Sequence, residues 1–291
     1  MFPDLQSATP ALPDYLIFNT PRSVFAFLLA GVPASTLRCI THLRVQFPDL
    51  VYEPSNEVHQ SYLTAVRILL RILPNLEDLV LLWTNVPPSV FDGVTFRLVA
   101  LTCTMSFNDF EGLKFLTMQD ELTLLELPHW RSSALGRPFF PREALLPDLG
   151  QVSLPPAGIM QLVPTRPVHS ADVRLVGRRV LPRVRTIYTK QVHSESEPRI
   201  DLGHVGMQED PISGETVVQL ESHQWPPLMR ALQDSASVVD DLAIATLDQF
   251  DPDVVLRAVA RHLPHLRSLY LRAYTPEDTA QVRGPGFSNN R

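Results

Sequence analysis

Lysine and cysteine are both scarce in this sequence. Lys114 and Lys190 are the only lysines among 25 cationic residues, and the rest are arginines. The two cysteines, Cys39 and Cys103, are too few for a disulfide framework, which is typical of a protein from a reducing compartment. Both lie in apolar, strand-like runs, which predicts small buried side chains rather than redox or metal-binding groups.

Long hydrophobic runs are also missing. The longest, VFAFLLAGVPA at residues 24–34, is shorter than the ~20 residues that span a bilayer. The N-terminal stretch MFPDLQSATPALPD lacks the basic start and apolar core of a secretory signal. We therefore expect a cytoplasmic or nuclear location without a membrane partner. The net charge of -6 provides no overall positive field, so we expect no nucleic-acid partner either.

Motifs that carry chemistry are absent as well. The sequence contains neither G-x-x-x-x-G-K-[ST] nor G-x-G-x-x-G, which cradle phosphates, and no G-x-S-x-G nucleophile turn. His262 and His265 are separated by Pro264, and no acidic or sulfur ligand recurs beside them. The sequence predicts no catalytic residue, no metal site and no cofactor. An enzyme, for example a hydrolase, would need an active site assembled from dispersed residues.

The composition is that of a globular protein, with 45% hydrophobic and 19% charged residues. The 27 prolines are spread along the whole chain. Because proline ends helices and avoids sheet interiors, this distribution indicates many short elements.

A repeated sequence pattern is the most informative feature that is present. ILPNLEDLVLLW (72–83) and HLPHLRSLYLRAY (262–274) share the pattern L-P-x-L-x-x-L-x-L, each behind a helical stretch. In the C-terminal copy, a strand at 238–247 is followed by Asp251 and Pro252, which favour a helix start. Strand, helix and strand with short connections predict two parallel neighbouring strands.

The earlier copy follows the same plan. A strand is predicted at 40–47, an amphipathic helix at 55–73, which Pro74 ends, and a strand at 76–83. Weaker strand-like copies follow at 96–105, 121–127, 145–154, 171–176, 181–190 and 216–222.

These copies favour an α/β fold of a particular kind. It is an irregular leucine-rich-repeat-like solenoid over residues 16–274, with a parallel concave sheet and outer helices or loops. The alternative is a doubly wound α/β sheet, which also alternates strands and helices. Several connections, however, are too short for a crossover helix. We further expect a flexible N-terminal lead at 1–15, an inserted polar loop at 192–215 and a disordered tail at 275–291.

In such a solenoid the leucines of each strand face the core, and the residues between them line the concave sheet. We predict this concave face as the partner-binding site. Val80, Leu82 and Leu124 fall on the same face and form an apolar patch, unless a neighbouring segment covers it. The predicted partner-binding residues are His42, Arg44, Gln46, Asp78, Arg174, Tyr188, Lys190, Tyr270 and Arg272.

A run of arginines between Arg174 and Arg185 permits two interpretations. It could bind an acidic or phosphorylated segment. The interpretation that we favour is a solvated convex edge, balanced by the acidic stretch at 193–201.

Three stretches resemble the F-box-associated, leucine-rich-repeat-like proteins of mushroom-forming fungi. LIFNTPRSVFAFLLAGVPASTLRCITHLRV (16–45) is similar to the segment that follows their F-box. FEGLKFLTMQDELTLLELP (110–128) and LLPDLGQVSLPPAGIMQLVPTRPVHSADV (145–173) are similar to two of their repeat units. The resemblance implies the recognition part of a substrate receptor in a Skp–cullin–F-box ubiquitin ligase.

The chain departs from that family at its start, where only LPDYLIF (12–18) is similar to an F-box. A Skp adaptor is therefore an expected partner only if an F-box is supplied elsewhere. The sequence thus predicts a non-catalytic scaffold that binds a protein partner or substrate. A repeat-built binding module unrelated to ubiquitin is the alternative.

Overall fold

The computed structural model describes residues 14–105, 110–130, 145–174, 176–177, 189–191, 216–217, 225–247 and 252–274. The predicted inserted loop and C-terminal tail lie outside these residues. So does the predicted N-terminal lead, apart from Asp14 and Tyr15.

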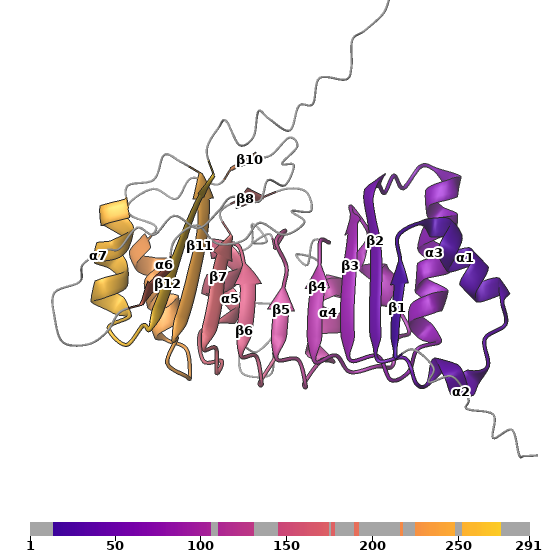
Figure 1. Cartoon of the computed structure of the whole chain (residues 1–291), viewed down its shortest axis with the longest axis horizontal. Coiled ribbons are helices and arrows are strands. Elements are labelled where there is room, and N and C mark those ends of the chain that lie inside the picture. The colour runs from indigo at the N-terminus through magenta and orange to yellow at the C-terminus, as the bar shows by residue number, and fades with distance from the viewer. Residues whose placement is uncertain are drawn as a thin grey trace, which may run out of the picture.

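The chain is an α/β protein with one large sheet (Figure 1). Its order is β1-β2-β3-β4-β5-β6-β7-β11-β12-β9, and neighbours are parallel as far as β12, whereas β9 is antiparallel to β12. From β1 to β12 the strands follow one another in chain order, without the reversal of a doubly wound sheet, and only β9 at the edge departs from this order among the described strands. The bounds are β1 (Tyr15–Phe18), β2 (His42–Val51), β3 (Asp78–Thr84), β4 (Ala100–Cys103), β5 (Leu124–Glu126), β6 (Gln151–Leu154), β7 (Ser170–Arg174), β9 (Thr189–Gln191), β11 (Asp241–Leu247) and β12 (Ser268–Tyr274).

One backbone arrangement recurs at the start of these strands. The carbonyl oxygen of the residue that precedes a strand accepts hydrogen bonds from two consecutive amides at the start of the next strand. Eight successive junctions have this form, with N···O distances from 2.7 to 3.2 Å. Each strand is thereby held in the same register as the one before it. The accepting carbonyls belong to Asp14, Thr41, Glu77, Val99, Thr123, Gly150, His169 and Asp240.

Helices connect the strands, and Figure 1 shows α4, α5 and α6 together behind the sheet. Their ends follow local sequence signals. The Asn56 side chain accepts hydrogen bonds from the amides of Val58 and His59 and caps α3. Proline occupies the first position of α1, α5 and α7, where its missing N–H costs nothing. The bounds are α1 (Pro21–Leu29), α2 (Ala34–Leu37), α3 (Glu57–Arg71), the 3-10 turn η1 (Pro88–Phe91), α4 (Phe110–Thr117), α5 (Pro156–Leu162), α6 (Trp225–Gln233) and α7 (Pro252–His262).

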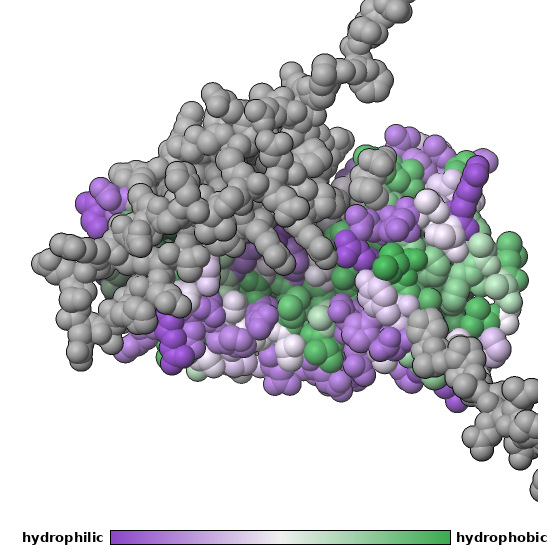
Figure 2. All heavy atoms as spheres, in the orientation of Figure 1, coloured by the Kyte–Doolittle hydropathy of each residue, from purple (hydrophilic) through white to green (hydrophobic). Residues whose placement is uncertain are grey.

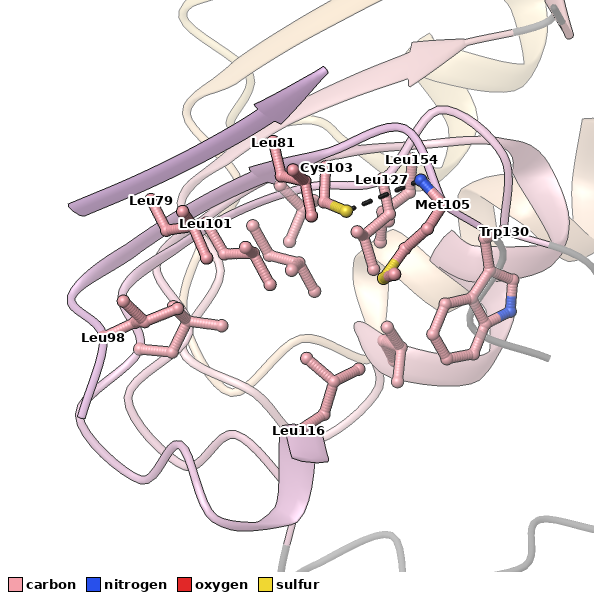
Figure 3. Close-up of a cluster of buried hydrophobic side chains, with 14 of the residues drawn as sticks. Leu79, Leu81, Leu98, Leu101, Cys103, Met105, Leu116, Leu127, Trp130 and Leu154 are labelled. Atoms are coloured by element: carbon pink, nitrogen blue, oxygen red, sulfur yellow. Dashed lines mark hydrogen bonds between the residues drawn. The ribbon is translucent and has the colours of Figure 1, made fainter. Parts of the chain in front are cut away.

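The core lies between the strands and these helices. Alternate residues of β3 and β4, among them Leu79, Leu81 and Leu101, are fully buried. Figure 3 shows Leu116 of α4 directed toward these strand leucines. The core is continuous from Phe18 of β1 to Leu269 of β12. Burial of this shared apolar surface is the principal force that holds each repeat to the next.

The two cysteines differ from each other. Cys103 is fully buried at the end of β4, as predicted. The prediction for Cys39 was wrong, because this residue follows α2 and is exposed, with its thiol donating to the Ser35 carbonyl at 3.3 Å. The apolar run around Cys39 belongs to the connection from α1 to β2 rather than to a strand.

Two of the weaker predicted strands do not continue the array. Within 181–190, the described residues belong to β9, which pairs antiparallel with β12 at the sheet edge. Within 216–222, β10 (Thr216–Val217) pairs antiparallel with β8 (Val176–Gly177) in a separate two-stranded sheet. The physical reason is that β11 pairs directly with β7, so the intervening chain has no position between them. Among the described residues between β7 and β11, α6 returns to the helix layer, where it contacts α5 and α7.

Candidate binding face of the sheet

The side of the sheet opposite the helices is called the open face here. Alternation along β3 places Leu79, Leu81 and Trp83 in the core, whereas Asp78, Val80 and Leu82 are half-buried on the open face. The period of two residues in an extended strand is the reason for this separation.

Parallel pairing aligns the open-face residues in rows that cross the strands. The first row runs through Tyr15, His42, Asp78, Ala100, Leu124, Gln151, Ser170, Asp241 and Ser268. The second row runs through Ile17, Arg44, Val80, Thr102, Glu126, Ser153, Asp172, Ala243 and Tyr270. His42, Arg44, Asp78 and Tyr270, which the sequence predicted for this face, all lie in these rows.

Arg174 occupies the centre of an ion network. Its Nη2 lies 2.5 Å from Oε1 of Glu126, and its Nε lies 3.0 Å from Oδ2 of Asp172. The Ser153 hydroxyl donates to the same Asp172 oxygen at 2.9 Å, and Thr102 donates to Glu126 at 3.3 Å. Because each charged side chain is only about a quarter to a third exposed (24%, 26% and 30%), these contacts fix the side chains better than fully exposed pairs would.

Arg174 therefore does not lie on a solvated convex edge, the interpretation that the arginine run had favoured. It lies on the open face, where the prediction of Arg174 as a partner-binding residue had put it. The remaining arginines of that run are outside the described residues.

The N-terminal part of the open face has different chemistry. Nε of Arg44 donates to Oε1 of Gln46 at 3.0 Å, and Nδ1 of His42 lies 2.8 Å from the Thr41 hydroxyl. Asp78, the register partner of His42, has a raised pKa because burial penalises its charged form, an effect that the nearby His42 partly offsets. This carboxylate is therefore less well solvated than an ordinary surface aspartate.

Apolar side chains lie near that carboxylate on β3 and β5. The predicted patch of Val80, Leu82 and Leu124 is half-buried on the open face. Tyr15 and Ile17 of β1, which were not predicted for this face, add apolar surface at its N-terminal edge, beyond His42 and Arg44, and are 43% and 50% exposed. Figure 2 shows hydrophobic atoms interspersed with hydrophilic ones over this part of the sheet. YLIF is apolar throughout, so no alternation in its sequence marks which of its residues are exposed.

Lys190 and Arg272 belong to β9 and β12 at the far end of the sheet. Arg272 is aligned with Ala245 of β11, on the open-face positions of β12. Lys190 is the register partner of Leu269 rather than of Tyr270, and Tyr188 lies outside the described residues. Gln46 is aligned with Leu82. A role of these residues in binding stays a prediction.

Glu126 and Asp172 are further open-face residues that the sequence analysis did not single out. Asp172 stands between two core residues of β7, and Glu126 follows a core residue of β5. The alternation of core and open-face positions along each strand therefore marks both. Their convergence on one arginine could not have been read from the sequence, because β5 and β7 are separated by β6.

Neither a metal site nor a membrane span is found in the described part of the chain. Its histidines, cysteines, aspartates and glutamates form no group of three or more that could hold a metal ion. Its helices include none that is long and apolar enough to cross a membrane.

Comparison of the chain with protein-family models, with curated proteins and with solved structures finds no match in any of the three.

Proposed function

We propose that the chain is a non-catalytic protein-interaction scaffold, built as an irregular leucine-rich-repeat-like solenoid. In this proposal a partner protein or protein substrate binds to the open face. The observation that carries the proposal is the set of ordered open-face rows. In these rows polar and apolar side chains stand in register on the side of the sheet that faces away from the core. Fixed side chains of mixed chemistry are suited to recognition, because little conformational entropy is lost when they bind.

The repeated junction supports the solenoid part of the proposal. The same pair of backbone hydrogen bonds occurs at eight junctions, although the chain length between them varies. A repeat that conserves its junction and varies its connection is typical of solenoids, in which each unit contacts its neighbours.

The resemblance to fungal F-box-associated proteins supports a more specific role, the substrate-recognition part of a Skp–cullin–F-box ubiquitin ligase receptor in the cytoplasm or nucleus. The Skp adaptor would then be reached through an F-box supplied elsewhere. A binding module unrelated to ubiquitin would use the same face.

The ion network favours binding over general acid–base chemistry. Arg174 lies between the carboxylates of Glu126 and Asp172 and occupies oxygen atoms that proton transfer would require. A hydrolase built from these residues would have to displace the guanidinium first.

The test is a capture experiment with matched variants. The tagged full chain is incubated with an extract of a mushroom-forming fungus, and captured proteins are quantified by mass spectrometry. The double variant Arg44→Glu/Leu82→Arg changes the open face, and Arg257→Glu on the exposed side of α7 is the control. We expect the control to retain the proteins that the double variant loses.

Two outcomes refine this result. A Skp adaptor and a cullin among the open-face-dependent proteins would support the ubiquitin-ligase role. Equal capture by the double variant and the control would contradict binding through the open face.

A further inference from the structure

The carboxylate of Asp78 differs from those of the ion network. Glu126 and Asp172 are both paired with Arg174, whereas the carboxylate of Asp78 forms no hydrogen bond or ion pair with any group in the described part of the chain. The nearest cation on the second row, Arg44, directs its Nε to Gln46. Burial raises the pKa of Asp78, so its ionised form would gain from a positive partner.

Asp78 has aliphatic neighbours on β3, β4 and β5, and its register partner on the β2 side is His42. Val80 and Leu82 follow it on the same face of β3. In the first row its neighbour is Ala100, whose side chain is a single methyl group, and Leu124 stands beyond. The short Ala100 side chain therefore extends less far from the sheet than the side chains of Asp78 and Leu124 on either side of it. Asp78, Val80, Leu82, Ala100 and Leu124 are called the β3 patch.

Such a patch fits a particular kind of side chain. Lysine and arginine carry a long aliphatic stem that ends in a cation, and they commonly lay the stem on apolar surface while the charged end meets a carboxylate. The stem would lie over Ala100 and Leu124 with the charge at Asp78. An adjacent aliphatic residue of the partner would then reach Val80 and Leu82.

We propose that the β3 patch binds a partner segment in which a lysine or arginine stands next to an aliphatic residue, with the cation at Asp78. This inference rests on the proposed function, because it names the partner chemistry that the open face recognises. The pairing of charges on the face supports it: Glu126 and Asp172 already share Arg174, whereas no arginine of the described residues is paired with the Asp78 carboxylate. A cationic segment is thus complementary to this carboxylate.

A displayed library of random 12-residue peptides tests the proposal against the immobilised full chain. We expect the enriched peptides to carry Lys or Arg within two residues of Leu, Ile, Val or Met. For a synthetic peptide from the enriched set, Asp78→Asn should weaken binding at least ten-fold. Asp241→Asn is the matched control, because Asp241 lies in the same row between Ser170 and Ser268, and it should change binding less than two-fold.

The variant Leu82→Arg distinguishes failure of this inference from failure of the proposed function. The inference would be overturned by acidic or neutral peptides that fail to bind Leu82→Arg and that bind Asp78→Asn with the same affinity as the unchanged chain. That result would leave the proposed function standing. Failure to enrich any peptide that depends on Leu82 would count against both. The thermal midpoint of each variant, followed by circular dichroism, confirms that the variants fold.

Discussion

The backbone amide of Asp241, at the start of β11, donates to the carbonyl oxygen of His169, which directly precedes β7, at 3.2 Å. The junction between β7 and β11 thus has the same geometry as the junctions between strands that are close in sequence. The long stretch of chain between them is accommodated without a change in sheet register.

Ser235 is expected to stabilise this junction. Its hydroxyl lies 2.7 Å from the Arg166 carbonyl oxygen and 2.9 Å from that of Val168, and so links the end of α6 to the connection between α5 and β7. We expect Ser235→Ala to lower the free energy of unfolding by about 1 kcal/mol, the usual contribution of one partly buried hydrogen bond. Urea unfolding measures the change, with Ser268→Ala as the control; equal effects of the two substitutions would contradict this role for Ser235.

Two adjacent leucines provide a direct test of which side of β3 faces the core. Leu81 is fully buried, and Leu82 is half-buried on the open face. We expect Leu81→Ala to cost about 3 kcal/mol or more, because it leaves a cavity, and Leu82→Ala to cost less than about 1 kcal/mol. Denaturant unfolding of both variants gives the comparison. Similar losses would mean that both faces of β3 are enclosed.

The raised pKa of Asp78 predicts a dependence on pH. A carboxyl group whose pKa is higher in the folded than in the unfolded chain stabilises the fold when protonated, and this contribution is lost as pH rises through the folded pKa. Asp78→Asn removes the ionisation, so we expect this variant to be more stable than the unchanged chain at pH 7 and equally stable well below the ordinary aspartate pKa. Denaturation midpoints measured from pH 7 downward check the trend. A variant that is less stable at pH 7 would indicate a favourable charge interaction of Asp78 within the fold.

The two thiols should react very differently. Burial raises the pKa of the Cys103 thiol to about 12, whereas Cys39 is exposed. We expect a thiol reagent at pH 8 to modify about one cysteine per native chain quickly, and the second only after unfolding. Cys39→Ser should abolish the fast reaction, and Cys103→Ser should leave it intact. Fast modification of Cys103 would show that the end of β4 opens readily.

Much of the array could be predicted because its signals are local. The helix at 57–71 begins at a polar cap and ends before Pro74, and both features are readable within a few residues. The alternation in LVLLW assigned Leu79 and Leu81 to the core and Val80 and Leu82 to the other face. The errors occurred where local pattern and tertiary pairing disagree: the segments at 181–190 and 216–222 have strand-like sequences, but their pairing partners are β12 and β8.

By itself the sequence determined the α/β class, the repeated order of strands and helices and the face on which many open-face side chains stand, because these depend on hydrophobic period and on proline and capping residues. Only the tertiary structure decided that β11 follows β7 in the sheet, that Arg174 joins Glu126 and Asp172, and that the Asp78 carboxylate stands beside Val80 without an ion-pair partner among the described residues. Those relationships join residues far apart in the chain. They depend on which strands become neighbours, a choice made by burial of the whole core rather than by any short stretch of sequence.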